Sequence, residues 1–424
     1  MKKTQPKRGS RKQKIRVGVV GLRRGLSFAR GAGPGLGMEL VALCDTWIER
    51  LDDAGRQLGV ETYADFDRFL EHDMDAVILA NYFHEHAPFA VKALKAGMHV
   101  MSETAACSTL GEGVALIDAV EKSGKTYMFA ENYPYMVFNQ EMRRLYQRGH
   151  IGEFQYGEGE YVHPMSAEEI NKLSPGVNHW RNWIPATYYC THALAPVMYI
   201  TGTWPVKVNG FVIPRSEDDS MLSRTARRND VASMIALRMD NDAVVKLLQV
   251  SLRGEGIWVR VHGTRGLMEN QRGGAEGMLR VRRERFDKKR GEPVEQVYRP
   301  DFPECHDKAV QAGHGGGDFF TPYHFSEAIR SGEQPLLDVY RGVSMSIVGI
   351  LAYRSALDDS NTVEIPDFRK KSVRAKFKND HWTPDPARRK KGDPWPSVSG
   401  DIQPTKQALA EAGKVWQTMG YEPE

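Results

Sequence analysis

The stretch from Ile15 to Asp45 constrains the fold of this chain most. It reads as a short apolar strand over residues 15–20, a glycine turn from Gly21 to Gly25, a helix-compatible stretch, a second apolar strand over residues 40–44, and then Asp45. A strand, a glycine turn, a helix, a strand and an acid in this order are typical of a dinucleotide-binding βαβ unit. The free N–H groups of such a turn face an anion such as a pyrophosphate.

The acid at the end of the second strand favours NAD over NADP, because its carboxylate accepts hydrogen bonds from a ribose and repels a 2′-phosphate. The glycine pattern is incomplete, since Arg23 stands at its middle glycine and its last glycine is shifted to Gly25 or replaced by Leu26. Arg23 or Arg24 can offset the repulsion of a 2′-phosphate. A strand, turn and helix without a ligand is the alternative interpretation.

The alternation of expected strands and helices continues to about residue 130. We expect helices over residues 49–58, 88–96 and 109–123, and strands over residues 76–80, 99–101 and 127–130. Thr109 and Glu112 have the spacing of a capping box at the start of the third helix. The pattern predicts an α/β domain, a Rossmann-type doubly wound parallel sheet.

From about Phe154 the pattern favours strands, over residues 154–161, 206–213, 231–239, 244–252 and 258–262. Helix-like stretches follow over residues 191–200, 319–331 and 339–357. This predicts a second, α+β domain with a mainly antiparallel open sheet. The predicted division is a basic disordered leader (1–14), an NAD-binding domain (15–150), a domain for substrate binding and dimerisation (151–368), and an irregular C-terminal arm (369–424) that wraps the body or a partner.

Composition narrows the class of protein. The 424 residues carry 58 Lys and Arg against 54 Asp and Glu, so the net charge is close to neutral. The basic runs near the ends have no nucleic-acid recognition motif beside them, so nucleic-acid binding is not expected. No apolar run approaches the roughly 20 residues of a membrane span. The leader has no apolar region typical of a secretory signal, so cytoplasm is the expected location.

The four cysteines form no C-x-x-C pair, which argues for reduced thiols. The antiparallel sheet favours a homodimer or homotetramer.

Ordered sequence blocks carry a family resemblance. They are Glu131-Asn132-Tyr133, residues 157–163 (GEGEYVH), 189–196 (YCTHALAP), 263–266 (GTRG), 314–319 (HGGGDF), 338–340 (DVY) and 366–368 (PDF). Over nearly its whole length the chain resembles the glucose-fructose oxidoreductase / inositol dehydrogenase (Gfo/Idh/MocA) family. It is most similar to glycoside hydrolase family 109, the α-N-acetylgalactosaminidase type.

The resemblance implies site residues and departures from the family pattern. His86 stands at the family's nucleotide-side histidine, and Glu103 begins the position of its Glu-Lys-Pro. Here the tripeptide is Glu103-Thr104-Ala105, so the lysine that helps ordinary dehydrogenases deprotonate a sugar alcohol is missing. Glu255 and Trp258 stand where the family 109 branch has a tyrosine-bearing strand. The predicted cofactor-binding residues are Gly21, Arg23, Gly25, Asp45, Asn81, His86 and Glu103.

The implied function is redox-assisted glycoside hydrolysis with NAD recycled. Oxidation at C3 acidifies the C2 proton, a base removes it, the C1 leaving group is eliminated, and water adds before the ketone is reduced. An NAD(P)-dependent sugar or cyclitol dehydrogenase is the alternative within the enzymes. A non-catalytic NAD-binding scaffold or sensor is the alternative of another class.

Four residues are predicted to be catalytic. Tyr189 and His192 are three apart at the start of a predicted helix and share one face, so they can form one proton relay. His163, with Tyr161, is assigned to the substrate or to the C2 side. Glu131 follows the last parallel strand and is expected to project into the same cleft. Three of them have a structural alternative: a packed aromatic ring for Tyr189, a hydrogen-bonded histidine for His163, and a cap for Glu131.

The predicted substrate-binding residues are Tyr161, Trp180, Arg181 and His314. Stacking on a sugar face is one interpretation of Trp180, Trp183 and Trp258, and packing is the other. The glycines after His314 permit close approach to a sugar, or serve the turn. No metal is predicted, although Glu131, His163 and His192 have the mixed donors of a metal site.

Overall fold

The first sheet is parallel and lies in the N-terminal part of the chain. The computed structural model describes residues 14–216, 218–220, 222–254, 256–273 and 277–421. Six strands pair in the order β3-β2-β1-β4-β5-β6: β1 (Ile15–Val20), β2 (Met38–Cys44), β3 (Glu61–Tyr63), β4 (Ala76–Leu79), β5 (His99–Ser102) and β6 (Tyr127–Phe129). All five pairings are parallel, which confirms the predicted doubly wound sheet. The short strand β3 was not predicted.

Helices connect these strands. They are α1 (Gly25–Gly31), α2 (Ile48–Leu58), α3 (Phe66–Phe69), α4 (His86–Lys95) and α5 (Leu110–Ser123), followed by α6 (Val137–Gln147). The predicted capping box is present, because the Glu112 N–H donates to Thr109 Oγ1 at 3.1 Å and the Glu112 carboxylate accepts from the Thr109 N–H. It starts α5 at the predicted position.

The second sheet has nine strands in the order β14-β13-β12-β11-β7-β10-β9-β8-β15. They are β7 (Phe154–Val162), β8 (Pro205–Ile213), β9 (Ala232–Met239), β10 (Val244–Val250), β11 (Ile257–Gly263), β12 (Gly266–Asn270), β13 (Leu279–Arg283), β14 (Glu295–Tyr298) and β15 (Val363–Glu364). Only the central pair β7–β10 is parallel among the described pairings. The mainly antiparallel prediction is therefore confirmed, while β12, β13 and β14 were not predicted.

The helices of the second half are α7 (Ala167–Leu173), α8 (Thr191–Thr201), α9 (His306–Ala309), α10 (Gly317–Ser331) and α11 (Val339–Leu357). Helix α8 packs on β7 and β11. Gly159 makes this close approach possible, because a Cβ there would lie 2.8 Å from the Ala193 carbonyl carbon. The start of α8 is thereby held against the sheet.

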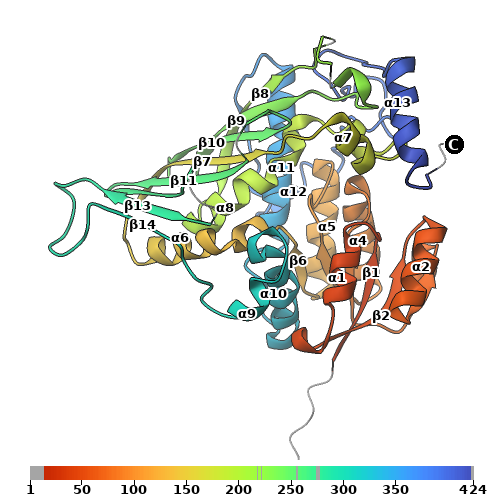
Figure 1. The fold of residues 1–424 in the computed structure, drawn as a ribbon, viewed down its shortest axis with the longest axis horizontal. Helices are drawn as coiled ribbons and strands as arrows, with labels where there is room; N and C mark the ends of the chain where they lie inside the picture. The colour runs from red at the N-terminus through yellow and green to blue at the C-terminus, as the bar shows by residue number, and fades with distance from the viewer. Residues whose placement is uncertain (1–13, 217, 221, 255, 274–276, 422–424) are drawn as a thin grey trace, which may run out of the picture.

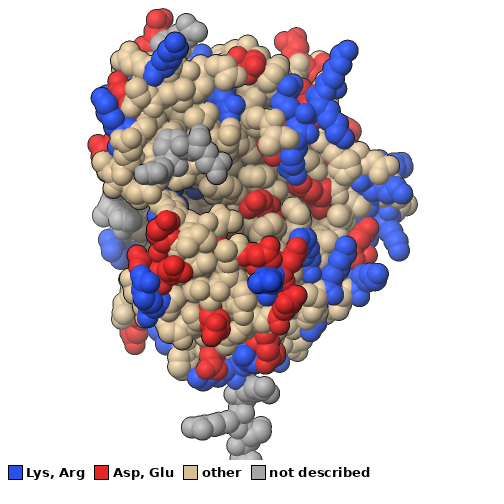
Figure 2. Space-filling view, turned by 90° about the vertical axis from the view of Figure 1, so that its right-hand side faces the viewer, with Lys and Arg blue, Asp and Glu red and all other residues tan. Residues whose placement is uncertain are grey.

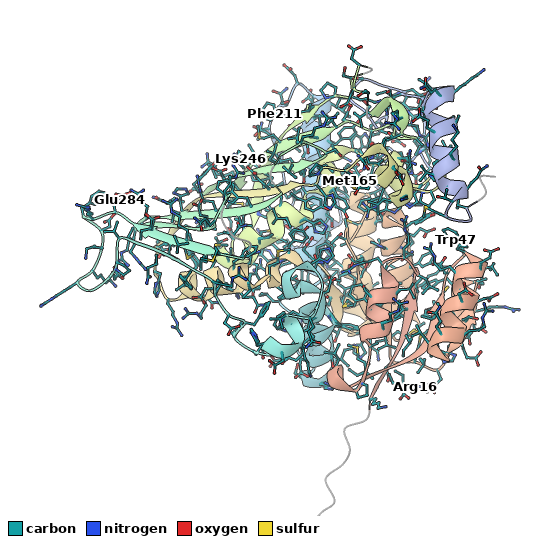
Figure 3. The ribbon with its side chains drawn as sticks, viewed as in Figure 1. Arg16, Trp47, Met165, Phe211, Lys246 and Glu284 are labelled. Atoms are coloured by element: carbon teal, nitrogen blue, oxygen red, sulfur yellow. The ribbon has the colours of Figure 1, made fainter. Side chains whose placement is uncertain are left out.

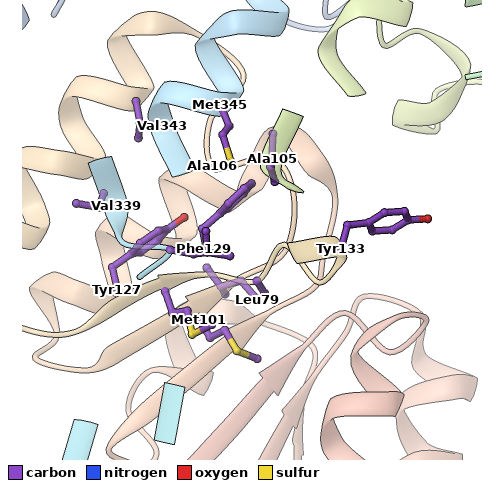
Figure 4. Close-up of a cluster of buried hydrophobic side chains, with 14 of the residues drawn as sticks. Leu79, Met101, Ala105, Ala106, Tyr127, Phe129, Tyr133, Val339, Val343 and Met345 are labelled. Atoms are coloured by element: carbon purple, nitrogen blue, oxygen red, sulfur yellow. The ribbon is translucent and has the colours of Figure 1, made fainter. Parts of the chain in front are cut away.

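Helix α11 joins the two halves of the molecule. It packs on β8 of the second sheet and on α5 and β6 of the first. Its side chains Val343 and Met345 lie above Phe129, Met101 and other buried residues of the parallel sheet (Figure 4). We call the part around the six-stranded sheet the nucleotide lobe and the part around the nine-stranded sheet the second lobe. The apolar packing of α11 fixes one lobe against the other.

The C-terminal residues run over the body of the protein. They contain α12 (Lys371–Arg374) and α13 (Lys406–Gln417), and Arg388 bonds to Glu112 at 2.6 Å. The predicted leader lies outside the described residues except for Lys14. Within the described part of the chain, no helix is both long enough and apolar enough to cross a bilayer.

Candidate active site

A cleft of about 1920 Å³ opens between the lobes. Figure 2 shows the hollowed face, and Trp47 and Met165, labelled in Figure 3, line it from opposite lobes. Small-molecule sites typically measure about 300–1,000 Å³. The cleft is therefore large enough for a dinucleotide and a second ligand together.

The glycine turn lies at the carboxyl edge of the parallel sheet. Gly21 has φ +86°, and a Cβ on it would lie 2.5 Å from the Ala80 carbonyl carbon and 2.6 Å from the Asn81 nitrogen. The Asp45 carboxylate accepts from the Leu22 N–H at 2.5 Å and from the Trp47 N–H at 2.8 Å. Gly21 and Asp45 both line the cleft, so the turn fits a dinucleotide whose ribose meets this acid.

Arg23, predicted to bind the cofactor, bonds to the second lobe. Its guanidinium donates to the Leu173 carbonyl oxygen at 2.8 Å and to that of Lys172, at the end of α7. Burial, with the charges of Arg50 and Arg181, lowers the Arg23 pKa to about 10. Arg23 lines the cleft, but in this arrangement it links the turn to α7 rather than presenting its donors to a phosphate.

Arg24 organises a charged network that the sequence did not reveal. Its Nε donates to Glu103 at 2.7 Å and its terminal nitrogens donate to both Asp318 oxygens at 2.6 and 3.0 Å. Asp318 also accepts from Asn132 at 2.8 Å and contacts His314 Nδ1 at 2.9 Å. Glu103 and His314 line the cleft as predicted, and Arg24 supplies a cation at Glu103 where Thr104 replaces the family lysine.

This network makes a testable contribution to stability. Burial opposes ionisation of Asp318, but hydrogen bonds from His314 and Arg24, and the Arg24 charge, hold its pKa well below the ordinary value. A depressed carboxyl pKa stabilises the fold above the unfolded-state pKa of about 3.9 and loses that effect as pH falls further. We expect Asp318→Asn to cost roughly 2–3 kcal/mol at pH 7, and this cost to shrink between pH 5 and pH 3.

Calorimetric melting of the wild type and Asp318→Asn from pH 7 to pH 3 measures this effect. The matched control is Asp73→Asn, because the Asp73 side chain is 90% exposed and surface ion pairs contribute little. A cost for Asp318→Asn that stays constant down to pH 3 would contradict the prediction.

His86 lines the cleft together with Asn81 and Glu103, and both of its ring nitrogens lie against backbone carbonyl oxygens. Its ring is 2% exposed, with Nδ1 2.9 Å from the Ala105 carbonyl oxygen and Nε2 3.2 Å from that of Asn81. Burial lowers its pKa, so the ring is neutral and donates a hydrogen bond to one of these two carbonyl oxygens. Asn81 lines the cleft, and its buried Oδ1 has no hydrogen-bond partner among the described residues, which fits an acceptor for a ligand.

His192 lies at the start of α8, on the wall of the cleft formed by the second lobe. Its Nδ1 is 2.6 Å from Glu131 Oε1, and the ring is 9% exposed. Tyr133 stacks on it with 4.5 Å between ring centroids, and Tyr161 and Tyr189 follow at 4.7 and 5.0 Å. The predicted pair Tyr189 and His192 is therefore brought together.

Glu131 does not project into the cleft, which corrects the prediction. Its side chain is fully buried, and its Oε1 also accepts from the Tyr133 N–H at 3.3 Å. A buried carboxylate on Nδ1 fixes the tautomer and orientation of a histidine. Glu131 thus acts through His192 as a positioning residue.

Tyr133 was missed as a site residue, although it lies in one of the sequence blocks that carry the resemblance. Burial, with the nearby Tyr161 and Glu131, raises its pKa above the ordinary tyrosine value. Its phenol is therefore neutral and acts by stacking and hydrogen bonding.

Residues predicted to bind the substrate and residues predicted to be catalytic lie together near this histidine. Arg181 stacks over Trp180 at 4.3 Å and faces Tyr189 at 5.5 Å, and His163 lies 5.7 Å from Tyr161 between ring centroids. All five line the cleft. They form an aromatic wall on the side of the cleft that belongs to the second lobe.

Trp183 and Trp258 do not take part in this wall. Trp183 is buried, and its Nε1 donates to the Asn178 carbonyl oxygen at 3.2 Å. Trp258 is held between Arg260 and Arg272 on the second sheet. Neither lines the cleft, so packing is their role, and Glu255 lies outside the described residues.

The mixed set of Glu131, His163 and His192 is not arranged as a metal site. In the described part of the chain, no three His, Cys, Asp or Glu side chains are grouped so that they could hold an ion. Nδ1 of His192 instead meets the carboxylate.

Two family models match the chain. Residues 15–131 match the oxidoreductase family, NAD-binding Rossmann fold, of the Gfo/Idh/MocA type. Residues 211–375 match the glycosyl hydrolase 109 C-terminal domain. The two matches cover the two lobes in the order that the resemblance predicted.

Individual relatives agree with these matches. A glycosyl hydrolase family 109 protein of Shewanella baltica is 27% identical over 391 residues, covering 84% of this chain and 85% of the relative. An alpha-N-acetylgalactosaminidase of Shewanella oneidensis is 26% identical, with the same coverage of each chain. Among solved structures, levoglucosan dehydrogenase in complex with NADH and levoglucosan has a TM-score of 0.71 and 20% identity, covering 84% of this chain and 100% of the other. That likeness concerns the fold.

Proposed function

We propose that this chain, a member of the Gfo/Idh/MocA family with a C-terminal domain of the glycosyl hydrolase 109 type, is an NAD-dependent enzyme that cleaves a glycoside through redox-assisted elimination. The observation that carries the proposal is that His192 lies in the same cleft as the glycine turn and Asp45, with its Nδ1 2.6 Å from the buried Glu131 carboxylate behind it.

The nucleotide lobe supplies the cofactor site. NAD, when bound, accepts a hydride and returns it. Gly21 leaves the backbone of the turn accessible, Asp45 offers a carboxylate to the ribose, and Asn81 offers its buried Oδ1. These groups suit NAD, whose adenosine ribose has a free 2′-hydroxyl, rather than NADP, which carries a 2′-phosphate.

Histidines of the second lobe transfer the protons of the reaction. Because Glu131 holds Nδ1, Nε2 of His192 is the nitrogen that exchanges a proton with a ligand. His192 takes the proton of the C3 hydroxyl as that carbon loses its hydride, through Tyr189 or directly, and returns it in the final step. We assign the C2 proton to His163, which lies next to Tyr161 at the end of β7. The aromatic wall of Trp180 and Tyr189, with Arg181, orients the sugar.

We favour glycoside cleavage over net dehydrogenation because the cleft, as far as the structure describes it, offers no lysine that could act as the dehydrogenase base. The only lysine among its described lining residues is Lys92, which pairs with Asp67 at 2.6 Å. The cation at Glu103 is Arg24, whose guanidinium is fully engaged by Glu103 and Asp318 and does not deprotonate. The base that ordinary dehydrogenases use is therefore missing.

Deuterium incorporation tests the reaction. A panel of nitrophenyl glycosides, beginning with the α-N-acetylgalactosaminide because of the relative in Shewanella oneidensis, is incubated in D2O with a catalytic amount of NAD. We expect release of nitrophenol, no net NADH, and one deuterium at C2 of the sugar, because the C2 proton exchanges with solvent while the C3 hydrogen returns as hydride.

Two outcomes would overturn this assignment. Stoichiometric reduction of NAD by a free sugar, with no aglycone released from any glycoside, would make the protein a dehydrogenase. Bound NAD with neither reaction across the panel would make it a scaffold or sensor.

A cytoplasmic location and a homodimeric or homotetrameric state remain predictions. Cys44, Cys107, Cys190 and Cys305 carry free thiols in the structure, which suits a reducing compartment. Phe211 and Ile213 are 44% and 43% exposed on β8, which suits an apolar contact between copies.

A further inference from the structure

The C-terminal helix is anchored on the second lobe. Helix α13 packs against α7, with Trp416 2% exposed and its Nε1 donating to the Asn171 carbonyl oxygen at 3.0 Å. Arg224 pairs with Glu411 at 2.6 Å. Helix α13 therefore holds the last described residues on the second lobe (Figure 1), and Gln417, at the end of the helix, lines the cleft.

A turn after α13 directs Tyr421 back across the cleft. Gly420 has φ +72°, and the Tyr421 N–H donates to the Trp416 carbonyl oxygen at 3.1 Å. The Tyr421 ring then meets Trp47 of the nucleotide lobe edge to face, with 5.9 Å between centroids and 71° between planes. Tyr421 thus contacts the residue that lies two positions after Asp45.

This contact lies at the ribose end of the cofactor site. The Trp47 N–H donates to Asp45 Oδ1 at 2.8 Å, and Arg50 stacks over the Trp47 ring at 4.2 Å. Gln417, Gly420 and Tyr421 line the cleft together with Asp45 and Trp47. A nucleotide whose ribose reaches Asp45 therefore has the C-terminal turn beside its adenosine end.

A second link crosses the cleft in the same region. Arg23, in the glycine turn, donates to the carbonyl oxygen of Leu173 at 2.8 Å, at the end of α7, and α7 is the helix on which α13 packs. The nucleotide part of the cleft is thus crossed by Arg23 and by the Tyr421–Trp47 contact.

We propose that the C-terminal turn, residues 417–421, covers the adenosine end of the cofactor site, and that Tyr421 and Trp47 together hold NAD in the protein between turnovers. The turn lies beyond residue 375, where the match to the glycosyl hydrolase 109 C-terminal domain ends. The proposal rests on NAD binding and not on glycoside cleavage.

Cofactor release in the absence of sugar tests the cover. The full-length protein is loaded with NADH, excess NAD is added, and the loss of bound NADH fluorescence gives the dissociation rate. An aromatic contact contributes about 0.5–1.5 kcal/mol, so we expect Tyr421→Ala to release NADH up to about tenfold faster. Tyr421→Phe keeps the ring and is expected to release it at the wild-type rate. Equal rates for Tyr421→Ala and the wild type would overturn the proposal.

A second measurement does not depend on a substitution. Hydrogen exchange of residues 406–421 is compared in the wild type with and without NAD. We expect slower exchange of residues 417–421 with NAD bound, and unchanged exchange there would overturn the cover. Neither measurement involves a sugar, so failure of the proposed glycoside cleavage leaves both results readable.

Discussion

His192→Ala is expected to lower glycoside cleavage by about 10³-fold while NAD affinity stays within about twofold of the wild type. A positioned general base or acid typically contributes 10²–10⁴-fold. Glu131 holds His192 at 2.6 Å, and the rings of Tyr133, Tyr161 and Tyr189 surround it. Among the described contacts, His314 is the one other histidine of the cleft wall with a carboxylate on its ring, that of Asp318. The measurement is kcat and KM with the best glycoside of the panel, together with NAD titration.

Two further variants sharpen this test. Glu131→Gln keeps a similar shape but removes the charge that holds Nδ1, so we expect a fall in kcat of about 10²-fold with little change in KM. His262→Ala is the matched control, because His262 lies on β11 against Tyr156 and does not line the cleft; its activity should stay at the wild-type level. Wild-type activity in His192→Ala would remove the histidine from the mechanism.

Gly21→Ala is expected to weaken NAD binding by about 100-fold or more and to destabilise the nucleotide lobe by about 2–4 kcal/mol. The residue has φ +86°, and its new Cβ would lie 2.5 Å from the Ala80 carbonyl carbon and 2.6 Å from the Asn81 nitrogen. These are backbone atoms at the end of β4, so they cannot move aside as a flexible side chain would. The turn must shift, and with it Asp45, which bonds to the Leu22 N–H.

Gly31→Ala is the matched control for this variant. Gly31 ends α1, and a Cβ there meets nothing within 4 Å, so alanine should be neutral or stabilise by up to about 1 kcal/mol. Urea unfolding and NAD titration of both variants give the two quantities. A Gly21→Ala protein that melts and binds like the wild type would mean that the turn tolerates a side chain and does not approach the nucleotide closely.

The sequence predicted the fold well where a local pattern repeats. The parallel strands, the capping box at Thr109, and helices α8, α10 and α11 follow from apolar periodicity and end signals over a few residues. It failed at β12, β13 and β14, because residues 279–283 (LRVRR) and 295–298 (EQVY) carry charges on a sheet face that only neighbouring strands explain. Pairing of this kind is a tertiary property.

The candidate site divides in the same way. Asp45 is identifiable from the chain because it follows a strand of the βαβ unit, and Tyr189 and His192 are identifiable because they lie in a sequence block that resembles the family. The roles of Glu131, Arg24 and Tyr133 are not, since each depends on a partner far away in sequence: Glu131 on His192, Arg24 on Asp318, and Tyr133 on the His192 ring. His86 stands at the expected place in the chain and lines the cleft, but only the structure shows that its ring nitrogens lie against the Ala105 and Asn81 carbonyl oxygens.

By itself the sequence determined the class of fold and the place of the cofactor turn, because these depend on short-range periodicity and on residue types at fixed spacing, and the family resemblance of residues 189–196 pointed to the histidine of the second lobe. Only the tertiary structure decided which side chains face the cleft, which carboxylate is buried behind His192, and that Tyr421 returns to Trp47. Those features depend on contacts between residues up to several hundred positions apart, and such contacts form only when helices α8, α11 and α13 pack the second lobe around the cleft.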